Sequence, residues 1–178
     1  MALETIIRRI SLAAAVLVTM IICSSAQQPA SKATTGPPEV KVGGAVTTPL
    51  VLTAADLKSM PRKTVRVENE HAQKAEVYEG VLVQDILKKA GATMGPKLRG
   101  PAMATYVLAE AADDYGVVFS LTEFDAEFQD SEILLADTVD GAPIPSDQGP
   151  FRLVAPHDKR PARWIKMLKS LTVGRAAN

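Results

Sequence analysis

The residues best suited to chemistry lie in one short basic stretch that follows Pro156 and ends at Lys166. Besides Lys166, the ionisable residues of this stretch that could face an anion are His157, Lys159, Arg160 and Arg163. Guanidinium groups bind phosphate through paired hydrogen bonds and ammonium groups add a point charge, so this clustering predicts a pocket for a small anion. Trp164, the only tryptophan, would form its apolar wall. The alternative is a solvated basic loop in which Trp164 anchors the core.

Two further positions offer polar chemistry. His71 lies in a polar segment beside Glu68 and Glu70, where it is either a metal ligand or acid–base group, or an exposed hairpin histidine. Tyr115 follows two consecutive aspartates. Its hydroxyl could lie at the rim of a pocket beside paired acids, although such a run is also typical of a turn between strands.

The elements that must position these residues are short. Alternating apolar patterns predict strands at residues 40–46, 64–67, 75–78, 105–109, 116–121, 133–139, 151–155 and 167–173. They show no regular βαβ rhythm, which favours a single α+β domain of mixed short strands and short helices. The pair Asp140 and Gly141 is a strong hairpin signal. Phe119, Phe124 and Phe128 are predicted to lie in the core.

Capping patterns predict where the short helices begin and end. Thr53 and Asp56 have the spacing of a capping box, and Pro61 would stop the helix that follows. A second helix has its apolar face at residues 82–90, with Gly91 placed as its C-terminal cap. A third is expected after Thr122, which again has capping spacing.

The first residues have the order of a secretory signal peptide. Arg8 and Arg9 precede an uncharged, mostly apolar run at residues 10–23, and small residues lead to Ala26. The run is shorter than the roughly 20 residues of a spanning helix. We therefore expect cleavage after Ala26 and a periplasmic or secreted protein, with lipidation of Cys23 as the alternative.

Composition defines the remaining organisation. We expect a signal peptide at residues 1–26, a flexible linker at 27–39, a folded domain at 40–174 and a tail at 175–178. The formal net charge is zero, so no basic excess points to nucleic acid. After cleavage the chain would contain no cysteine and no apolar stretch long enough to span a membrane.

The order of several landmarks resembles one known family. They are residues 42–46 (VGGAV), 53–61, 78–81 (YEGV), 114–116 (DYG), 134–136 (LLA), 140–145 (DGAPIP), 149–156 (GPFRLVAP) and 163–166 (RWIK). In this order they resemble the oxidoreductase molybdopterin-binding domain, the sulfite oxidase fold, and most closely its small stand-alone periplasmic members.

The resemblance implies a molybdopterin cofactor, with contacts to the cofactor phosphate from the loop at residues 157–166. Catalytic members also bind molybdenum through one cysteine, in the segment that corresponds here to residues 64–78. That segment contains no cysteine, and a carboxylate or imidazole is a poor replacement for a soft thiolate. No haem attachment motif is present, so haem is not expected.

Three hypotheses follow for the function. The leading one is an exported member of this fold that lacks the molybdenum ligand and binds a small anionic ligand or a partner protein. The second is an active molybdopterin-dependent oxidoreductase that attaches the metal without a thiolate. The third is a structural interaction module in an envelope complex.

Overall fold

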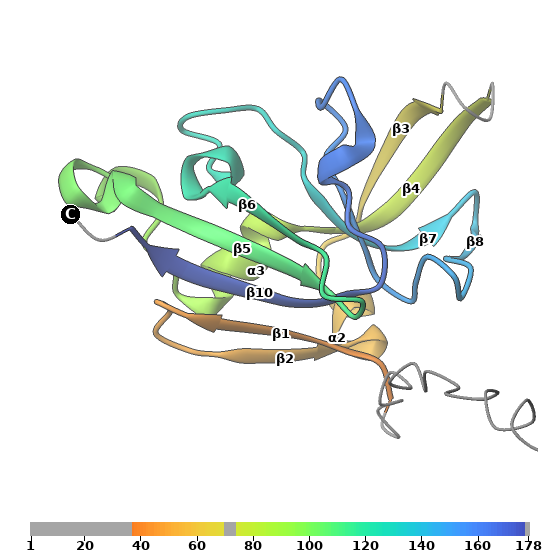
Figure 1. Ribbon diagram of the computed structural model, residues 1–178, viewed down its shortest axis with the longest axis horizontal. Coiled ribbons are helices and arrows are strands. Elements are labelled where there is room, and N and C mark those ends of the chain that lie inside the picture. Colours follow the sequence, from red (N-terminus) through yellow and green to blue (C-terminus); the bar gives the residue numbers. More distant parts are fainter. Residues whose placement is uncertain (1–36, 70–73, 177–178) are drawn as a thin grey trace, which may run out of the picture. The chain divides into compact units, whose positions relative to one another are not determined.

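Two β-sheets organise residues 37–69 and 74–176, the part of the chain that the computed structural model describes (Figure 1). The first sheet contains, in spatial order, β2 (Leu50–Thr53), β1 (Glu39–Gly44), β10 (Leu168–Arg175), β5 (Thr105–Ala111) and β6 (Gly116–Ser120). β1 and β10 run parallel, and the other neighbouring strands are antiparallel. β10, in the middle of this sheet, begins two residues after Lys166, where the basic stretch ends.

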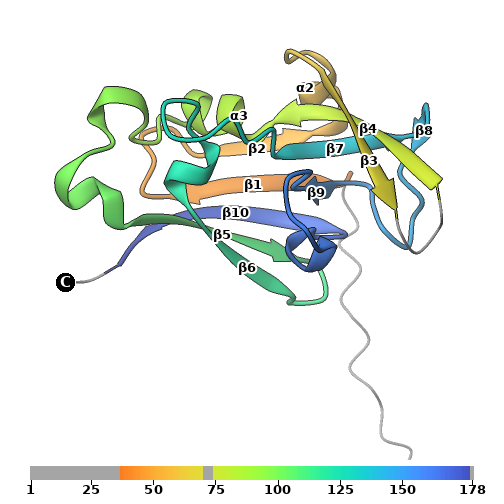
Figure 2. The same cartoon turned by 90° about the horizontal axis from the view of Figure 1, so that it is seen from above.

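The second sheet is antiparallel throughout. Its strands, in spatial order, are β3 (Lys63–Asn69), β4 (Lys74–Leu82), β7 (Leu134–Val139) and β8 (Ala142–Pro143), and β9 (Arg152–Val154) also pairs with β7. Figures 1 and 2 show β3 and β4 as a long hairpin that extends away from the strands of the first sheet. The tight β7–β8 turn places Asp140 and Gly141 at φ values of 49° and 78°, the positive values that such hairpin turns require.

The helices are short and begin and end at identifiable residues. In the described residues they are α2 (Ala54–Lys58), α3 (Val83–Ala90) and four 3₁₀ turns, η1 (Gly95–Lys97), η2 (Gly100–Ala104), η3 (Leu121–Phe124) and η4 (Pro161–Arg163). Thr53 and Asp56 form the predicted capping box of α2, and Gly91 ends α3 at φ 74°. None of the helices in the described ranges is long and apolar enough to cross a membrane.

Two apolar clusters hold these elements together. The larger combines both sheets with α2 and α3, and includes Val42, Leu57, Ile86 and Phe119. The smaller one covers the second sheet with side chains such as Tyr78 and Ile144. Trp164 packs against both clusters, so it belongs to the core as well as to the segment that follows β9.

Gly80 shows how closely the strands of the second sheet approach each other. A Cβ atom at this position would lie 2.1 Å from the carbonyl oxygen of Leu135 on β7, and the strand register shifts between Glu79 and Gly80. Only glycine fits at this position of β4, because any side chain would meet the backbone carbonyl oxygen of Leu135, which cannot move aside as a flexible side chain could.

The predicted α+β class is confirmed, whereas three local expectations are wrong. The capping box near residue 122 starts at Ser120 and produces only one 3₁₀ turn. Phe128 is 44% exposed and lies outside the core. The first strand ends at Gly44, where φ is 84°, and a separate strand, β2, follows.

Candidate functional site

The basic stretch is fixed to the body of the domain by its own backbone. Leu153 and Ile165 exchange two backbone hydrogen bonds of 2.8 and 3.1 Å, which bring the end of the stretch back beside β9. The indole N–H of Trp164 donates to the carbonyl of Ala155 over 2.8 Å. The segment at residues 156–164 is thus a closed loop whose two ends lie side by side.

Arg163 holds this loop from the inside. Its guanidinium donates to both carboxylate oxygens of Asp158, at 2.9 and 2.5 Å, and to Glu123 at 2.7 Å. It also lies 4.7 Å from the centroid of the Phe119 ring. The hydrogen bonds from Arg163 to Asp158, followed by those to Glu123, raise the pKa of Arg163. Two carboxylates therefore already neutralise this cation, which was predicted to bind an anion.

The remaining predicted cations of the loop face solvent. His157, Lys159 and Arg160 are exposed, and within the described ranges none of them forms an ion pair or a side-chain hydrogen bond. None of the three lines the pocket described below. The structure therefore brings together only part of the predicted cluster.

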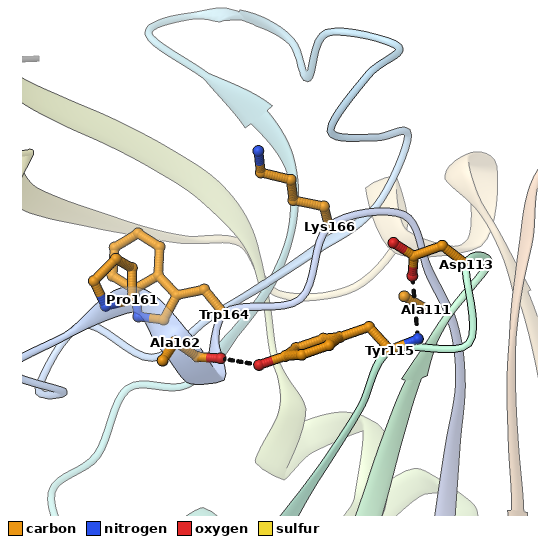
Figure 3. A pocket seen from close by; sticks show the side chains of 7 residues that line it. All are labelled: Ala111, Asp113, Tyr115, Pro161, Ala162, Trp164 and Lys166. Carbon is orange, nitrogen blue, oxygen red and sulfur yellow. Dashed lines mark hydrogen bonds between the residues drawn. The ribbon is translucent and has the colours of Figure 1, made fainter. Parts of the chain in front are cut away.

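A pocket of about 290 Å³ lies between the β5–β6 turn and the η4 region (Figure 3). It is lined by Ala111, Asp113, Tyr115, Pro161, Ala162, Trp164 and Lys166. Two of the predicted site residues, Tyr115 and Trp164, therefore meet in one place. Asp113 is one of the paired acids predicted beside Tyr115 at a pocket rim, and Lys166 ends the basic stretch, but the sequence alone did not place the two in one pocket.

The pocket walls are fixed by hydrogen bonds. The Tyr115 hydroxyl donates to the carbonyl of Ala162 over 2.6 Å and so joins the β5–β6 turn to η4. One carboxylate oxygen of Asp113 accepts the backbone N–H of Tyr115 at 3.2 Å. Figure 3 shows both bonds, with Lys166 between Trp164 and Asp113 in this view.

The two charges of the pocket are not paired with each other. Lys166 has no ion pair within 4.0 Å among the described residues, and neither has Asp113. The neighbouring charges are Asp114 and Lys169, which pair at 2.9 Å. An ammonium and a carboxylate therefore remain available on one pocket surface.

A stacked arginine lies behind Trp164. The Arg152 guanidinium carbon is 5.3 Å from the Tyr78 ring centroid and 5.4 Å from that of Trp164. The Nη1 atom of Arg152 donates to the Tyr78 hydroxyl at 2.8 Å and to the side-chain oxygen of Gln148 at 2.6 Å. Its Nε atom is buried and has no hydrogen-bond partner in the part of the chain that the structure describes. Burial, followed by the hydrogen bond to Glu76, raises the pKa of Tyr78 to about 12. The sequence signal for Arg152 was its place in the segment GPFRLVAP, which was noted without assigning the arginine a role.

Metal-ligand chemistry has little support in the described residues. No group of three or more His, Cys, Asp or Glu side chains there could hold a metal ion. His71 lies outside the described residues, so its predicted role has no structural counterpart. Cys23, the only cysteine in the sequence, also lies outside them.

The two sheets, the short helices and the closed loop define an α+β domain of the sulfite oxidase type, and two comparisons support this assignment. The family profile of the oxidoreductase molybdopterin binding domain matches residues 33–178, and the chain belongs to this family. The crystal structure of the sulfane dehydrogenase SoxCD from Paracoccus pantotrophus is similar, with a TM-score of 0.59 and 23% sequence identity. The match covers 76% of this chain and 37% of that one, so the chain spans little more than a third of that structure's length. No curated protein matches the sequence.

The family implies a molybdopterin cofactor, and the described residues fit it poorly. They contain no cysteine and no cluster of ligating side chains for the metal. The pocket contributes Lys166 as its only cation, beside the carboxylate of Asp113. We therefore derive no chemical step through this cofactor.

Proposed function

We propose that this protein is an exported member of the molybdopterin-binding family that binds a small ligand through an anionic group and does not hold molybdenum by a protein thiolate. The observation that carries the proposal is the state of Lys166. It lines the pocket and has no ion pair among the described residues, whereas Arg163 is already neutralised.

The surroundings of Lys166 suit an anionic group on a compact organic body. The Trp164 and Tyr115 rings provide apolar surface, and the hydroxyl and indole N–H of these residues already donate to backbone carbonyls. Lys166 and Tyr115 are exposed, so an ammonium beside these walls supplies a charge-assisted hydrogen bond at an open surface site. This arrangement supports binding more directly than it supports a reaction.

The proposal about the metal rests on residues 64–78. The corresponding segment of catalytic members supplies the cysteine ligand, and here it contains none. A thiolate is soft, and the oxygen and nitrogen ligands nearby are harder donors that differ in metal preference. We infer that purified protein contains no stoichiometric molybdenum.

Export is part of the same proposal. The basic, apolar and small residues at positions 8–26 support cleavage after Ala26 and a periplasmic or secreted location. Intact-mass measurement of the exported protein should reveal loss of residues 1–26. A diacylglycerol mass on Cys23 would contradict this and would tether the protein to a membrane.

The central experiment combines metal analysis with ligand titration. Protein matured by export should contain no molybdenum by elemental analysis, and pyrophosphate should change the fluorescence of Trp164, the only tryptophan. Lys166→Gln should weaken this binding roughly twofold to fivefold, because Lys166 is exposed and exposed ion pairs contribute about 0.2–1 kcal/mol. Lys159→Gln, which removes an exposed cation outside the pocket, is the matched control. Unchanged binding in Lys166→Gln would refute the proposal.

Family membership favours one alternative, an active molybdopterin-dependent oxidoreductase with non-thiolate metal attachment. About one molybdenum per chain in the same elemental analysis would establish that alternative. If no anion binds, an envelope partner protein becomes the better explanation for the anchored loop between β9 and β10.

A further inference from the structure

Asp113 gives the pocket a second recognition element. It lines the same pocket as Lys166, yet no ion pair joins the two within 4.0 Å. One of its carboxylate oxygens accepts the Tyr115 N–H, which orients the side chain. The other has no hydrogen-bond partner among the described residues. A pocket for a simple anion would be weakened by a carboxylate on its wall, because like charges repel.

The surrounding charges do not explain Asp113 as part of an ion pair. Lys169, the nearest lysine along β10, donates to Asp114 at 2.9 Å. On the neighbouring strand β5, Glu110 accepts a hydrogen bond from Ser170 at 3.0 Å. Asp113 is therefore the carboxylate of this region that points into the pocket without a cationic partner within 4.0 Å.

The aromatic walls complete a site for a cationic amine. Tyr115 and Trp164 are held by hydrogen bonds to Ala162 and Ala155, so they present ring surface instead of polar groups. Ring faces attract ammonium groups, and a carboxylate nearby supplies the compensating charge. Asp113, Tyr115 and Trp164 thus have the chemistry that recognises an alkylammonium group.

We propose that the pocket binds a small zwitterion, with its cationic amine at Asp113 and the aromatic walls and its anionic group at Lys166. This inference rests on the proposed function for the Lys166 half of the site and adds the Asp113 half. The pocket volume of about 290 Å³ lies at the lower end of typical ligand sites, which favours a compact compound of the amino-acid or betaine class.

The test compares three probes that carry both charged groups, the cationic group alone or the anionic group alone. The protein from the full chain would be titrated with glycine betaine, choline and acetate, following Trp164 fluorescence and heat release. Glycine betaine should bind at least about tenfold more tightly than either singly charged compound, because it alone uses both ends of the pocket. Asp113→Asn should weaken glycine betaine binding about tenfold and leave acetate or pyrophosphate binding unchanged or tighter.

Asp114→Asn is the matched control, since it removes the adjacent carboxylate that already pairs with Lys169. Thermal unfolding of each variant would verify that the fold is retained. If glycine betaine binding survives Asp113→Asn while Lys166→Gln still weakens pyrophosphate, the zwitterion inference is wrong and the proposed function stands. If neither glycine betaine nor pyrophosphate binds, both fail. If Asp113→Asn weakens betaine but Lys166→Gln affects no probe, the site recognises cations alone, and both are again refuted.

Discussion

Replacing Arg163 by methionine should loosen the loop more than it should remove a ligand contact. The arginine donates to Asp158 and Glu123 and lies over the Phe119 ring. Methionine retains an apolar contact with that ring but carries no charge. The variant leaves two carboxylates, whose side chains are only 17% and 21% exposed, without their cation.

The size of the effect follows from exposure. Hydrogen bonds to charged groups contribute about 1.5–3 kcal/mol when buried, whereas exposed ion pairs contribute about 0.2–1 kcal/mol. The Arg163 side chain is 37% exposed, so we place each carboxylate contact between these ranges, at about 1 kcal/mol. The total loss of about 2 kcal/mol corresponds to a decrease in Tm of roughly 4–8 °C for a domain of this size.

Thermal unfolding followed by circular dichroism measures this loss. A double-mutant cycle with Glu123→Gln would isolate the Arg163–Glu123 term, because glutamine can still accept the backbone N–H of Ser120. Arg160→Met is the control, and at an exposed position it should cost less than about 0.5 kcal/mol. An unchanged Tm in Arg163→Met together with lost pyrophosphate binding would refute this reasoning and make Arg163 a ligand-binding residue.

Three further changes should affect stability in defined ways. Tyr78 has its pKa raised to about 12, so the stability that the neutral hydroxyl contributes is complete below about pH 10, the pKa in the unfolded chain, and is lost as pH rises from about 10 to 12. Tyr78→Phe should remove this alkaline decline of the unfolding free energy, measured by chemical denaturation. Gly80→Ala should destabilise by about 3 kcal/mol or cause misfolding, since the added carbon meets the Leu135 carbonyl; a normal Tm would contradict this. Burial acts to raise the pKa of Asp137, but hydrogen bonds from Arg62 and Thr138 together with the Arg62 charge lower it overall, so the stability that Asp137 contributes is present above about pH 4 and is lost as pH falls through its lowered pKa; Asp137→Asn should flatten this acid dependence of the unfolding free energy.

Most strands and both α-helices could be predicted because their signals are local. Thr53 with Asp56, and Gly91 after an apolar helical face, are recognisable within a few residues of sequence. β2 was missed because it is only four residues long and merges with the cap of α2. Phe128 was misplaced because an aromatic residue is usually buried, and no local pattern marks an exposed one.

The candidate site was predicted less completely because its charges are arranged by long-range contacts. Arg163 and Lys166 look equivalent in the sequence, but only Arg163 meets Glu123, which is 40 residues away along the chain. Tyr115 could be placed at a pocket rim from its turn, whereas its bond to Ala162, 47 residues away, could not. Composition identified which side chains were available, and tertiary contacts decided which of them remain free.

The anchoring of the loop explains how the pocket keeps its shape. Three contacts fix it: Arg163 to Glu123, Tyr115 to Ala162, and Trp164 to Ala155. Tyr115 lies in the β5–β6 turn and Arg163 and Trp164 are neighbours at η4, and none of the three contacts uses Lys166 or Asp113. The walls are therefore preorganised whether or not a ligand is present, which lowers the entropic cost of binding. Lys166 is not among these supports, and Asp113 supports only its own turn by accepting the Tyr115 N–H, which asparagine can also accept. Substitutions at Lys166 and Asp113 should therefore change affinity while leaving the fold intact.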